Sequence, residues 1–333
     1  PKSSAATIDA ASMLAHAALV YQRFPEFTDY ANECRTRAIS AWNYFRSNPM
    51  NDGITSGKDG PSGGDKDTTA QIQDSVVTAI YLYALTNNTV YNNYIKQHYQ
   101  QTRPMKDVWW GWGLYDNWQS QALMYYTTLP NADATVKTAI QNGKTYSGSY
   151  SWIGWNDNLD LYRGYMPDGQ YHWGSNMVKA DVGNSLMEFV AYNILPQHKN
   201  QYLNHALEVL HNFHGVNPMG LTYITSMEPY GGDSCAHYMY HQWYLTAIVP
   251  AGYIPGGPNS SYAPDPSYSG PPLEPPQNQP PQKSYKDWGN TWPENSWEVT
   301  EPSISYQAEY VLLLSFFAQE KNTPTSVIDW YLY

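Results

Sequence analysis

Helical periodicity constrains this chain more than any other feature of its sequence. Apolar residues recur at the spacing of a helix face in most segments, and the alternation typical of half-buried strands is scarce. Helices are predicted at residues 5–23, 29–46, 68–86, 89–102, 117–128, 132–146, 175–193, 199–214, 236–247 and 302–320. Because consecutive helices bury their apolar faces against each other, the pattern predicts an all-α fold of stacked helical hairpins. No repeat of fixed length is visible, which disfavours a regular solenoid.

Long connections separate the predicted helices and carry most of the glycine, proline and tryptophan. They span residues 49–67, 103–116, 146–174, 215–235 and 248–301. Loops of this length in a compact domain are usually functional. The proline-rich stretch at residues 256–288 has the composition of a disordered linker. We predict an ordered wall instead, because aromatic residues punctuate the stretch, namely Tyr262, Tyr268, Tyr285 and Trp288.

Charge and cysteine content exclude several classes of protein. The chain of 333 residues has a net charge of −11, only 18 Lys and Arg, and no basic run, which argues against nucleic acid or an anionic membrane as a partner. No apolar segment is long enough to span a bilayer. Residues 1–21 lack the charged leader and long apolar core of an intact signal peptide. Cys34 and Cys235 are predicted as two free or buried thiols rather than a disulfide.

The aromatic residues are mainly those that carry a polar group. The chain has 13 Trp and 31 Tyr against 7 Phe. Such rings suit wet surfaces that offer a flat apolar face, and a sugar ring is a ligand of that shape. Composition therefore leaves two interpretations open, a sugar-binding protein or a tyrosine-rich secreted protein with aromatics spread over core and surface.

Four segments in the second half of the chain point to a family when taken together. They are YHWGSN (171–176), HGVNPMGLTYITSM (214–227), YHQWYLTAIVPAGYIPGGPN (240–259) and TEPSISYQA (300–308). Each motif alone is weakly specific. In order, spacing and content, the four together resemble the C-terminal part of the catalytic domain of glycoside hydrolase family 9, a cellulase family with an (α/α)6 toroid. The proline-rich stretch resembles the bacterial branch that usually carries an immunoglobulin-like module.

The resemblance extends over the whole chain, because residues 3–24 resemble a helix from the middle third of the family's domain. It implies that residues 1–333 are the C-terminal major portion of one catalytic domain, a toroid without its first helices in this chain. The unpaired helices would expose large apolar faces. We therefore expect the N-terminal segment of the same domain to be a partner of this chain.

Glu298 and Glu301 stand just ahead of the last predicted helix, with Pro302 at its start. Acidic residues and proline are common at helix starts, so an ordinary helix cap is one interpretation. The resemblance favours a catalytic glutamate, because Tyr306–Ala308 follow Glu301 at the spacing found after the family's proton donor. Glu301 is therefore the predicted general acid. A helix start lowers a carboxyl pKa, so burial and a second carboxylate would have to raise it.

Substrate-binding residues follow from the same resemblance. Trp173 occupies the place of an aromatic sugar platform, and Tyr306 lies close to the acid in sequence. His172 is either a hydroxyl-binding residue or a structural histidine. His241 matches the family's cleft histidine, while Trp243 stands where many members have arginine.

Two further features bear on sugar binding. Met177 stands where an arginine often follows the first platform, which together with Trp243 points to a different subsite preference. Trp109, Trp110 and Trp112 are candidate further platforms, and at least one of them is expected in the core.

A glycine-rich loop at residues 54–74 is a candidate metal site. It carries four aspartates: Asp59, Asp65, Asp67 and Asp74. Hard oxygen ligands at such spacing suit calcium. The resemblance also implies calcium here, although the family's adjacent Asp-Glu pair is Gln73-Asp74 in this chain. A solvated polar loop is the alternative, since the pattern is not that of an EF-hand. No organic cofactor is expected.

The resemblance implies an inverting hydrolase of β-1,4-glucosidic bonds in cellulose or related β-glucans, secreted to an extracellular or periplasmic location. In an inverting enzyme one carboxylic acid protonates the leaving oxygen while a separate carboxylate activates water. The family's general base lies in an Asp-Ala-Gly-Asp motif, which this chain lacks, and Asp65 and Asp67 are the nearest look-alike. The base is therefore expected in the preceding segment of the domain. The alternatives are an exo-acting β-glucosaminidase on the same scaffold and a glycan-binding relative without catalysis.

Overall fold

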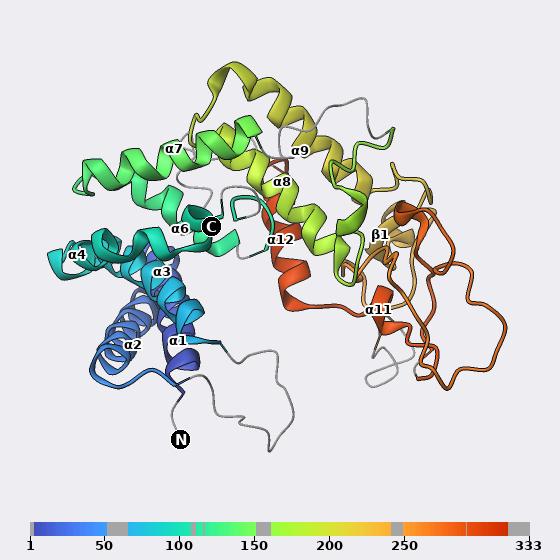
Figure 1. The fold of residues 1–333 in the computed structure, drawn as a ribbon, viewed down its shortest axis with the longest axis horizontal. Helices are drawn as coiled ribbons and strands as arrows, with labels where there is room; N and C mark the ends of the chain where they lie inside the picture. Colours follow the sequence, from blue (N-terminus) through green and yellow to red (C-terminus); the bar gives the residue numbers. More distant parts are fainter. Residues whose placement is uncertain are drawn as a thin grey trace. The chain divides into compact units, whose positions relative to one another are not determined.

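The computed structural model describes residues 3–51, 66–107, 111–115, 117–150, 161–240, 249–290 and 292–318. The chain forms two compact units. The first unit comprises residues 1–112, 116–149 and 324–333, and the second comprises residues 113–115 and 150–323. In the described part of both units helices predominate (Figure 1), which confirms the predicted all-α fold.

Helical hairpins form the first unit. Its helices are α1 (Ser4–Tyr21), α2 (Thr28–Ser47), α3 (Thr68–Thr86), α4 (Thr89–His98), α5 (Arg103–Lys106), α6 (Asn117–Thr128) and α7 (Ala134–Tyr150). α1 packs against both α2 and α3, and α3 also packs against α4 and α6. The alanines on the buried face of α1 keep its side chains short, which suits a helix that is covered by two neighbours.

Polar caps determine where the helices of the first unit begin. The Ser3 hydroxyl oxygen accepts a hydrogen bond from the Ala6 amide (3.2 Å) at the start of α1. The Asp67 carboxylate accepts one from the Ala70 amide (2.8 Å) at the start of α3. Such side chains satisfy amides that have no partner inside the helix.

The second unit is organised around one buried helix. Its regular elements are α8 (Ser175–Ala191), α9 (Lys199–Phe213), β1 (Thr222–Thr225), β2 (Cys235–Ala236), α11 (Trp297–Thr300) and α12 (Ile304–Ser315). α9 and α12 both pack against α8 (Figure 1). Gly183 in α8 permits the close approach of α12, because a Cβ there would lie 2.7 Å from the Leu313 side chain. α8 is consequently buried along most of its length.

The proline-rich wall, residues 256–288, is ordered as predicted. Three of its aromatic side chains, those of Tyr262, Tyr285 and Trp288, are buried. The fourth, Tyr268, donates a hydrogen bond from its hydroxyl to the Pro271 carbonyl (2.9 Å). Short 3-10 helices lie in this and the other connections: η1 (Pro25–Phe27), η2 (Tyr99–Gln101), η4 (Asp168–Gln170), η5 (Pro196–His198), η6 (Glu228–Tyr230) and η7 (Pro281–Lys283).

Two helix predictions near the C-terminal half need correction. Residues 236–240 are not helical, because β2 pairs in parallel with β1 and the chain continues from it without regular structure. Residues 241–247 of the same predicted helix lie outside the described residues. The last helix begins at Ile304 rather than at 302, since α11 and a short extended segment precede it.

Two other predictions concern cysteines and membranes. Cys34 and Cys235 are both free and buried, which confirms the thiol interpretation. Among the described residues, no helix combines the length and the apolar character needed to cross a membrane.

Candidate active site

Three of the sequence motifs meet in the second unit through backbone hydrogen bonds. At the start of α8, the Asn176 amide donates to the Gly256 carbonyl (3.0 Å) and its side-chain Nδ2 donates to the Pro255 carbonyl (3.0 Å). Gly257 in turn donates its amide to the Val299 carbonyl in α11 (2.9 Å). The motifs YHWGSN, IPGGPN and TEPSISYQA therefore form one connected framework.

Gly257 is required at the centre of this framework. Its φ is +95°, in the region that favours glycine. A Cβ at this position would also lie 2.5 Å from Cγ of Asn176. Any larger residue would push the loop away from the N-terminus of α8.

Residues at the start of α12 attach the predicted acid segment to the same framework. Gln307 pairs with the Ile254 backbone twice, donating from Nε2 to the carbonyl (2.8 Å) and accepting from the amide at Oε1 (2.8 Å). The Tyr306 hydroxyl lies against Gly174, where a Cβ would come within 2.7 Å of it. Gly174 follows Trp173 directly, so Tyr306 connects the segment of Glu301 to that of the predicted platform.

Glu301 lies in the break between two helices rather than in a helix. It follows α11 with an extended backbone, at φ −64° and ψ 126°, and its amide donates to the Trp297 carbonyl (3.0 Å). Ser303, not Glu301, caps α12 by accepting from the Ser305 amide (3.3 Å). Glu301 is thus the C-cap residue of α11 and precedes the cap of α12, so it does not itself cap the last helix.

The phenol of Tyr306 is electrostatically coupled to Glu301. Burial raises the pKa of Tyr306 to about 12, and the charge of Glu301 contributes in the same direction. Tyr306 is therefore neutral near pH 7 and close enough to Glu301 to sense its carboxylate. This is the relation expected between an acid and the aromatic residue that lines its site.

Glu298 has a different, structural set of contacts. Its Oε2 accepts hydrogen bonds from Nδ2 of Asn259 (3.1 Å) and from the Ala263 amide (3.4 Å). Burial raises the pKa of Glu298, and these two hydrogen bonds partly offset the effect. Glu298 thus fastens the wall to α11, which supports Glu301 as the proton donor; the assignment stays a prediction.

Trp173 is 44% exposed, as a sugar platform must be. His172 beside it has a partner on each ring nitrogen, the Trp173 carbonyl at Nδ1 (2.9 Å) and the Tyr115 hydroxyl at Nε2. The Tyr115 hydroxyl in turn donates to Oε1 of Gln170 (2.8 Å), so His172 belongs to a chain of hydrogen bonds. These contacts favour the structural interpretation of His172, in which it holds the turn before Trp173. Tyr115 was not foreseen, because nothing in the sequence connects it to His172.

The prediction that Trp112 is a sugar platform is wrong for this structure. Trp112 is fully buried in the first unit. Its ring packs against Gly143, where a Cβ would lie 3.1 Å away, and Nζ of Lys144 donates to its carbonyl (3.2 Å). Trp112 is the core member that the VWWGWG segment was expected to contain. Other predicted binding residues lie outside the described residues, namely Trp109, Trp110, His241 and Trp243.

The described aspartates of the predicted calcium loop do not fit a calcium site. Asp67 caps α3, and Asp65 lies outside the described residues. Asp74 is buried, and its oxygens accept from Nζ of Lys66 (2.7 Å) and from Nε1 of Trp118 (3.1 Å). The Lys66 ammonium therefore already supplies the positive charge beside Asp74. Burial raises the pKa of Asp74 to about 6, although Lys66 opposes that rise.

A buried lysine supports the loops of the second unit and was missed by sequence analysis. Lys179 in α8 is 2% exposed, and its Nζ donates to Oδ1 of Asn212 (2.6 Å). The same Nζ lies 5.5 to 5.9 Å from the ring centroids of Tyr171, Phe213 and Tyr223. Aromatic faces and a hydrogen bond together stabilise a charge away from water. Lys179 thereby connects YHWGSN to the segment before the NPMG turn.

The NPMG turn itself is closed by one side chain. Nδ2 of Asn217 donates to the carbonyls of Asn212 (2.7 Å) and Leu221 (2.7 Å). Its Oδ1 accepts from the Met219 amide (3.0 Å). The asparagine of this motif therefore maintains the shape of the loop.

Residues 1–314 match the sequence model of the family described as glycosyl hydrolase family 9. The chain belongs to this family. No curated protein matches the chain in a sequence comparison.

Solved structures of the family share the fold of this chain. A crystal structure of the family 9 endoglucanase J30 has a TM-score of 0.71 at 23% identity, covering 95% of this chain and 54% of that one. A metagenome-derived family 9 endoglucanase has a TM-score of 0.73 at 21% identity, with 95% and 53% covered. AaCel9A in complex with cellobiose-like isofagomine has a TM-score of 0.70 at 18% identity, with 96% and 56% covered. These likenesses agree with the expected (α/α)6 class, and this chain spans about half the length of the solved chains.

Proposed function

We propose that the protein containing this chain hydrolyses β-1,4-glucosidic bonds in cellulose or a related β-glucan, with inversion and with Glu301 as proton donor. One observation carries the proposal. Glu301 lies on the framework that also carries Trp173, joined to it through Tyr306 and the turn at Gly174. A carboxylic acid and a half-exposed aromatic ring carried by one framework can act together, the acid protonating a glycosidic oxygen while the ring holds a sugar.

The second catalytic group is a carboxylate that activates water. In inverting enzymes it lies about 6.5–9.5 Å from the acid, which leaves room for the water molecule. The family resemblance assigns this role to a motif that is absent from the 333 residues. We propose that the base belongs to a part of the domain outside this chain. Asp65 and Asp67 are the alternatives within it, although Asp67 already caps α3.

The proposed substrate class rests on the relatives. J30 and the metagenome-derived protein are described as endoglucanases, and AaCel9A was crystallised with a cellobiose-like ligand. A polymeric or insoluble glucan does not enter cells, so the proposal includes an extracellular or periplasmic location. Calcium at residues 56–74 stays a prediction from the sequence, to be tested by elemental analysis and by melting in chelator.

Glu301→Gln tests the proposal directly, with Glu298→Gln as its matched control. In the full-length protein, Glu301→Gln should lower kcat on unactivated β-glucan by about 10²–10⁴-fold, because general acid catalysis is lost. Its melting temperature and oligosaccharide binding should be nearly unchanged. Glu298→Gln should instead affect mainly stability, since Glu298 fastens the wall.

Three results would overturn the proposed acid or the proposed activity. If Glu298→Gln is folded and loses more activity than Glu301→Gln, the acid is Glu298. If the wild-type protein binds β-glucan oligosaccharides but hydrolyses none, the glycan-binding alternative is correct. Hydrolysis confined to glucosaminides would establish the exo-acting alternative.

A further inference from the structure

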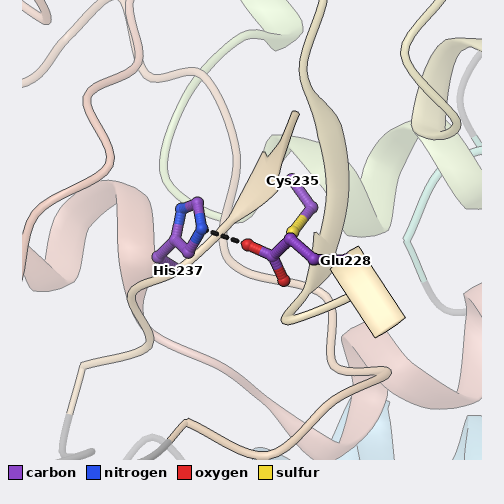
Figure 2. A group of neighbouring side chains, drawn as sticks. All are labelled: Glu228, Cys235 and His237. Carbon is purple, nitrogen blue, oxygen red and sulfur yellow. Dashed lines mark ion pairs between the residues drawn. The ribbon is translucent and has the colours of Figure 1, made fainter. Parts of the chain in front are cut away.

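Outside the proposed active site, three side chains with different metal-binding atoms converge in the second unit (Figure 2). Glu228 comes from η6, Cys235 from β2 and His237 from the segment just after it. Their ligand atoms, a carboxylate oxygen, the Sγ and a ring nitrogen, all lie within 4.8 Å of one another. None of these residues belongs to the motifs that carry the proposed hydrolysis.

The backbone holds this cluster in place without help from a ligand. Ser226 donates its amide to the Ala236 carbonyl (2.9 Å), and the Met227 amide donates to Sγ of Cys235 (3.2 Å). Gly231, at φ +91°, closes η6 in a conformation that favours glycine. The three side chains are therefore presented by a turn that is fixed at both ends.

Asp287, from the wall, orients the histidine of the cluster. Its two carboxylate oxygens accept from the amides of His237 (2.8 Å) and Tyr238 (3.1 Å). Oδ2 also lies 3.4 Å from Nδ1 of His237. A carboxylate at Nδ1 keeps a proton on that nitrogen and turns Nε2 outward as a ligand, as in many zinc sites.

The orientation of His237 creates a need for positive charge. Its Nε2 contacts a carboxylate oxygen of Glu228 (Figure 2). If the only ring proton is on Nδ1, the lone pair of Nε2 faces a negatively charged oxygen, which is repulsive. A proton on Nε2, or a metal ion bound by both atoms after they move apart, removes this repulsion.

We propose that Glu228, Cys235 and His237 bind one zinc ion. Sulfur, imidazole nitrogen and carboxylate oxygen are the three donors that zinc accepts, whereas calcium and magnesium prefer oxygen alone. Three protein ligands leave a fourth position for water. The Cys235 side chain is buried, whereas those of Glu228 and His237 are 43% and 58% exposed, so the ion can enter from solvent.

Binding exchanges protons for the metal. Zinc binds a cysteine as the thiolate, whereas a free thiol carries a proton at neutral pH. Zinc displaces that proton as the thiolate–metal bond forms, and it also displaces any proton on Nε2 of His237. Affinity should therefore fall as pH is lowered, because protons compete for the same ligand atoms.

The bound ion would stabilise a segment that leads to the acid. The chain continues from His237 to Tyr240, whose amide donates to the Thr300 carbonyl directly before Glu301 (3.0 Å). A metal that joins η6, β2 and this segment acts as a structural clamp. Its role does not depend on whether Glu301 is the proton donor.

The test uses full-length protein purified through chelator and titrated with zinc, and in parallel with cobalt as a spectroscopic probe. The wild type should bind one equivalent of zinc and melt at a higher temperature with it. With cobalt it should show the thiolate-to-metal charge-transfer absorption that only a cysteine ligand produces. Cys235→Ser should lose the absorption and bind zinc at least 100-fold more weakly. Asp287→Asn should weaken zinc binding about 10–100-fold, as loss of an orienting carboxylate does.

Cys34→Ser is the matched control, because Cys34 is the other buried thiol and lies in α2 of the first unit. It should keep both the cobalt absorption and the zinc affinity. The wild-type cobalt spectrum tests the site even if Cys235→Ser fails to fold. Absence of that absorption in the wild type, or its persistence in folded Cys235→Ser, would overturn the proposal. So would a Glu228→Gln variant that is destabilised equally with and without zinc, since a simple imidazolium–carboxylate pair would then account for the cluster.

Discussion

The helices that bury the largest number of residues in the described part of each unit, α3 and α8, differ in what they bury. α3 buries mainly aliphatic and tyrosine side chains along its length, with polar contacts concentrated near its N-terminus. α8 buries polar and charged residues throughout, among them Lys179, Asp181 and Glu188. α3 therefore packs mainly through apolar contacts with neighbouring hairpins, whereas α8 binds neighbouring segments through buried polar side chains.

The polar residues of α8 explain this difference. Asn176 bonds to the loop at Pro255, Lys179 to Asn212, and Asn184 to Glu309 of α12 (2.8 Å). A buried polar group that lacked its partner would cost about 1–3 kcal/mol, so each of these bonds fixes a neighbouring segment against α8, namely the loop at Pro255, α9 or α12. The comparison teaches that buried polar side chains of a core helix position the segments around the proposed site.

Apart from changes to Glu301, Gly257→Ala should disrupt the attachment of the loops to α8 most strongly. The new Cβ would collide with Asn176 and force the loop away from α8, which should cost about 1–3 kcal/mol of overpacking beyond the backbone strain. Gly252→Ala is the matched control, because Gly252 has a similar φ of +92° but no atom within 4 Å of its Cβ position. Chemical denaturation and β-glucan hydrolysis measure the two effects.

The Gly257 variant should lose both stability and activity, whereas the Gly252 variant should show only the cost of the strained backbone. Equal losses in the two variants would mean that the contact with α8 does not position the loop.

Asp74→Asn tests the contribution of a buried polar residue near the N-terminus of α3. The pKa of Asp74 rises from 3.8 to about 6 on folding, so the folded state binds its proton more tightly than the unfolded state does. Stability from this group is therefore present at low pH and declines as pH rises from about 4 to 6, by ~3 kcal/mol at most. Urea unfolding of both proteins across pH 4–7 should show this decline in the wild type and a flatter profile in Asp74→Asn. Parallel profiles would show that Lys66 fully compensates the burial.

Trp173→Ala should have the smallest effect on the fold and a specific effect on ligand binding. Loss of an exposed ring that stacks on a sugar should weaken cello-oligosaccharide binding about 10-fold, equivalent to ~1.4 kcal/mol. Trp292→Ala is the control, because Trp292 is 61% exposed and lies outside the motif. Calorimetric titration that finds both variants equally weakened, or neither, would remove Trp173 from the proposed binding site.

Long periodic helices were predictable from sequence because their signal is local. α3 and α6 begin and end where the apolar pattern does, and α1, α2 and α9 differ by one or two residues. The four motifs could likewise be found in the sequence because each is a short contiguous string, and three of them meet in one framework. The break between α11 and α12 around Glu301 was harder to predict, because acidic residues and proline are equally compatible with a helix start and with a gap between helices.

The features that could not be predicted depend on contacts between residues that are distant in sequence. The sequence is equally compatible with Trp112 as a sugar platform and as a core residue. The neighbour that decides between the two, Gly143, lies in α7. The sequence did not indicate that the Lys66 ammonium pairs with Asp74, and calcium in this loop stays a prediction. The Glu228, Cys235 and His237 cluster was invisible because β2 was not predicted, and its orienting carboxylate, Asp287, is 50 residues from His237.

The hydrogen bonds that close the wall determine how its sequence could be engineered. Its outer part is closed on itself, because Asn259 donates its amide to the Ser284 carbonyl (2.8 Å) and Asp265 donates its amide to the Pro293 carbonyl (2.9 Å). A loop whose ends are joined in this way can change in length or sequence without disturbing the elements that carry it. Residues 266–280 are therefore expected to tolerate exchange, and transplanting the corresponding loop of another family member would alter the surface beside the framework that carries Glu301, while Glu298 keeps its anchor on Asn259.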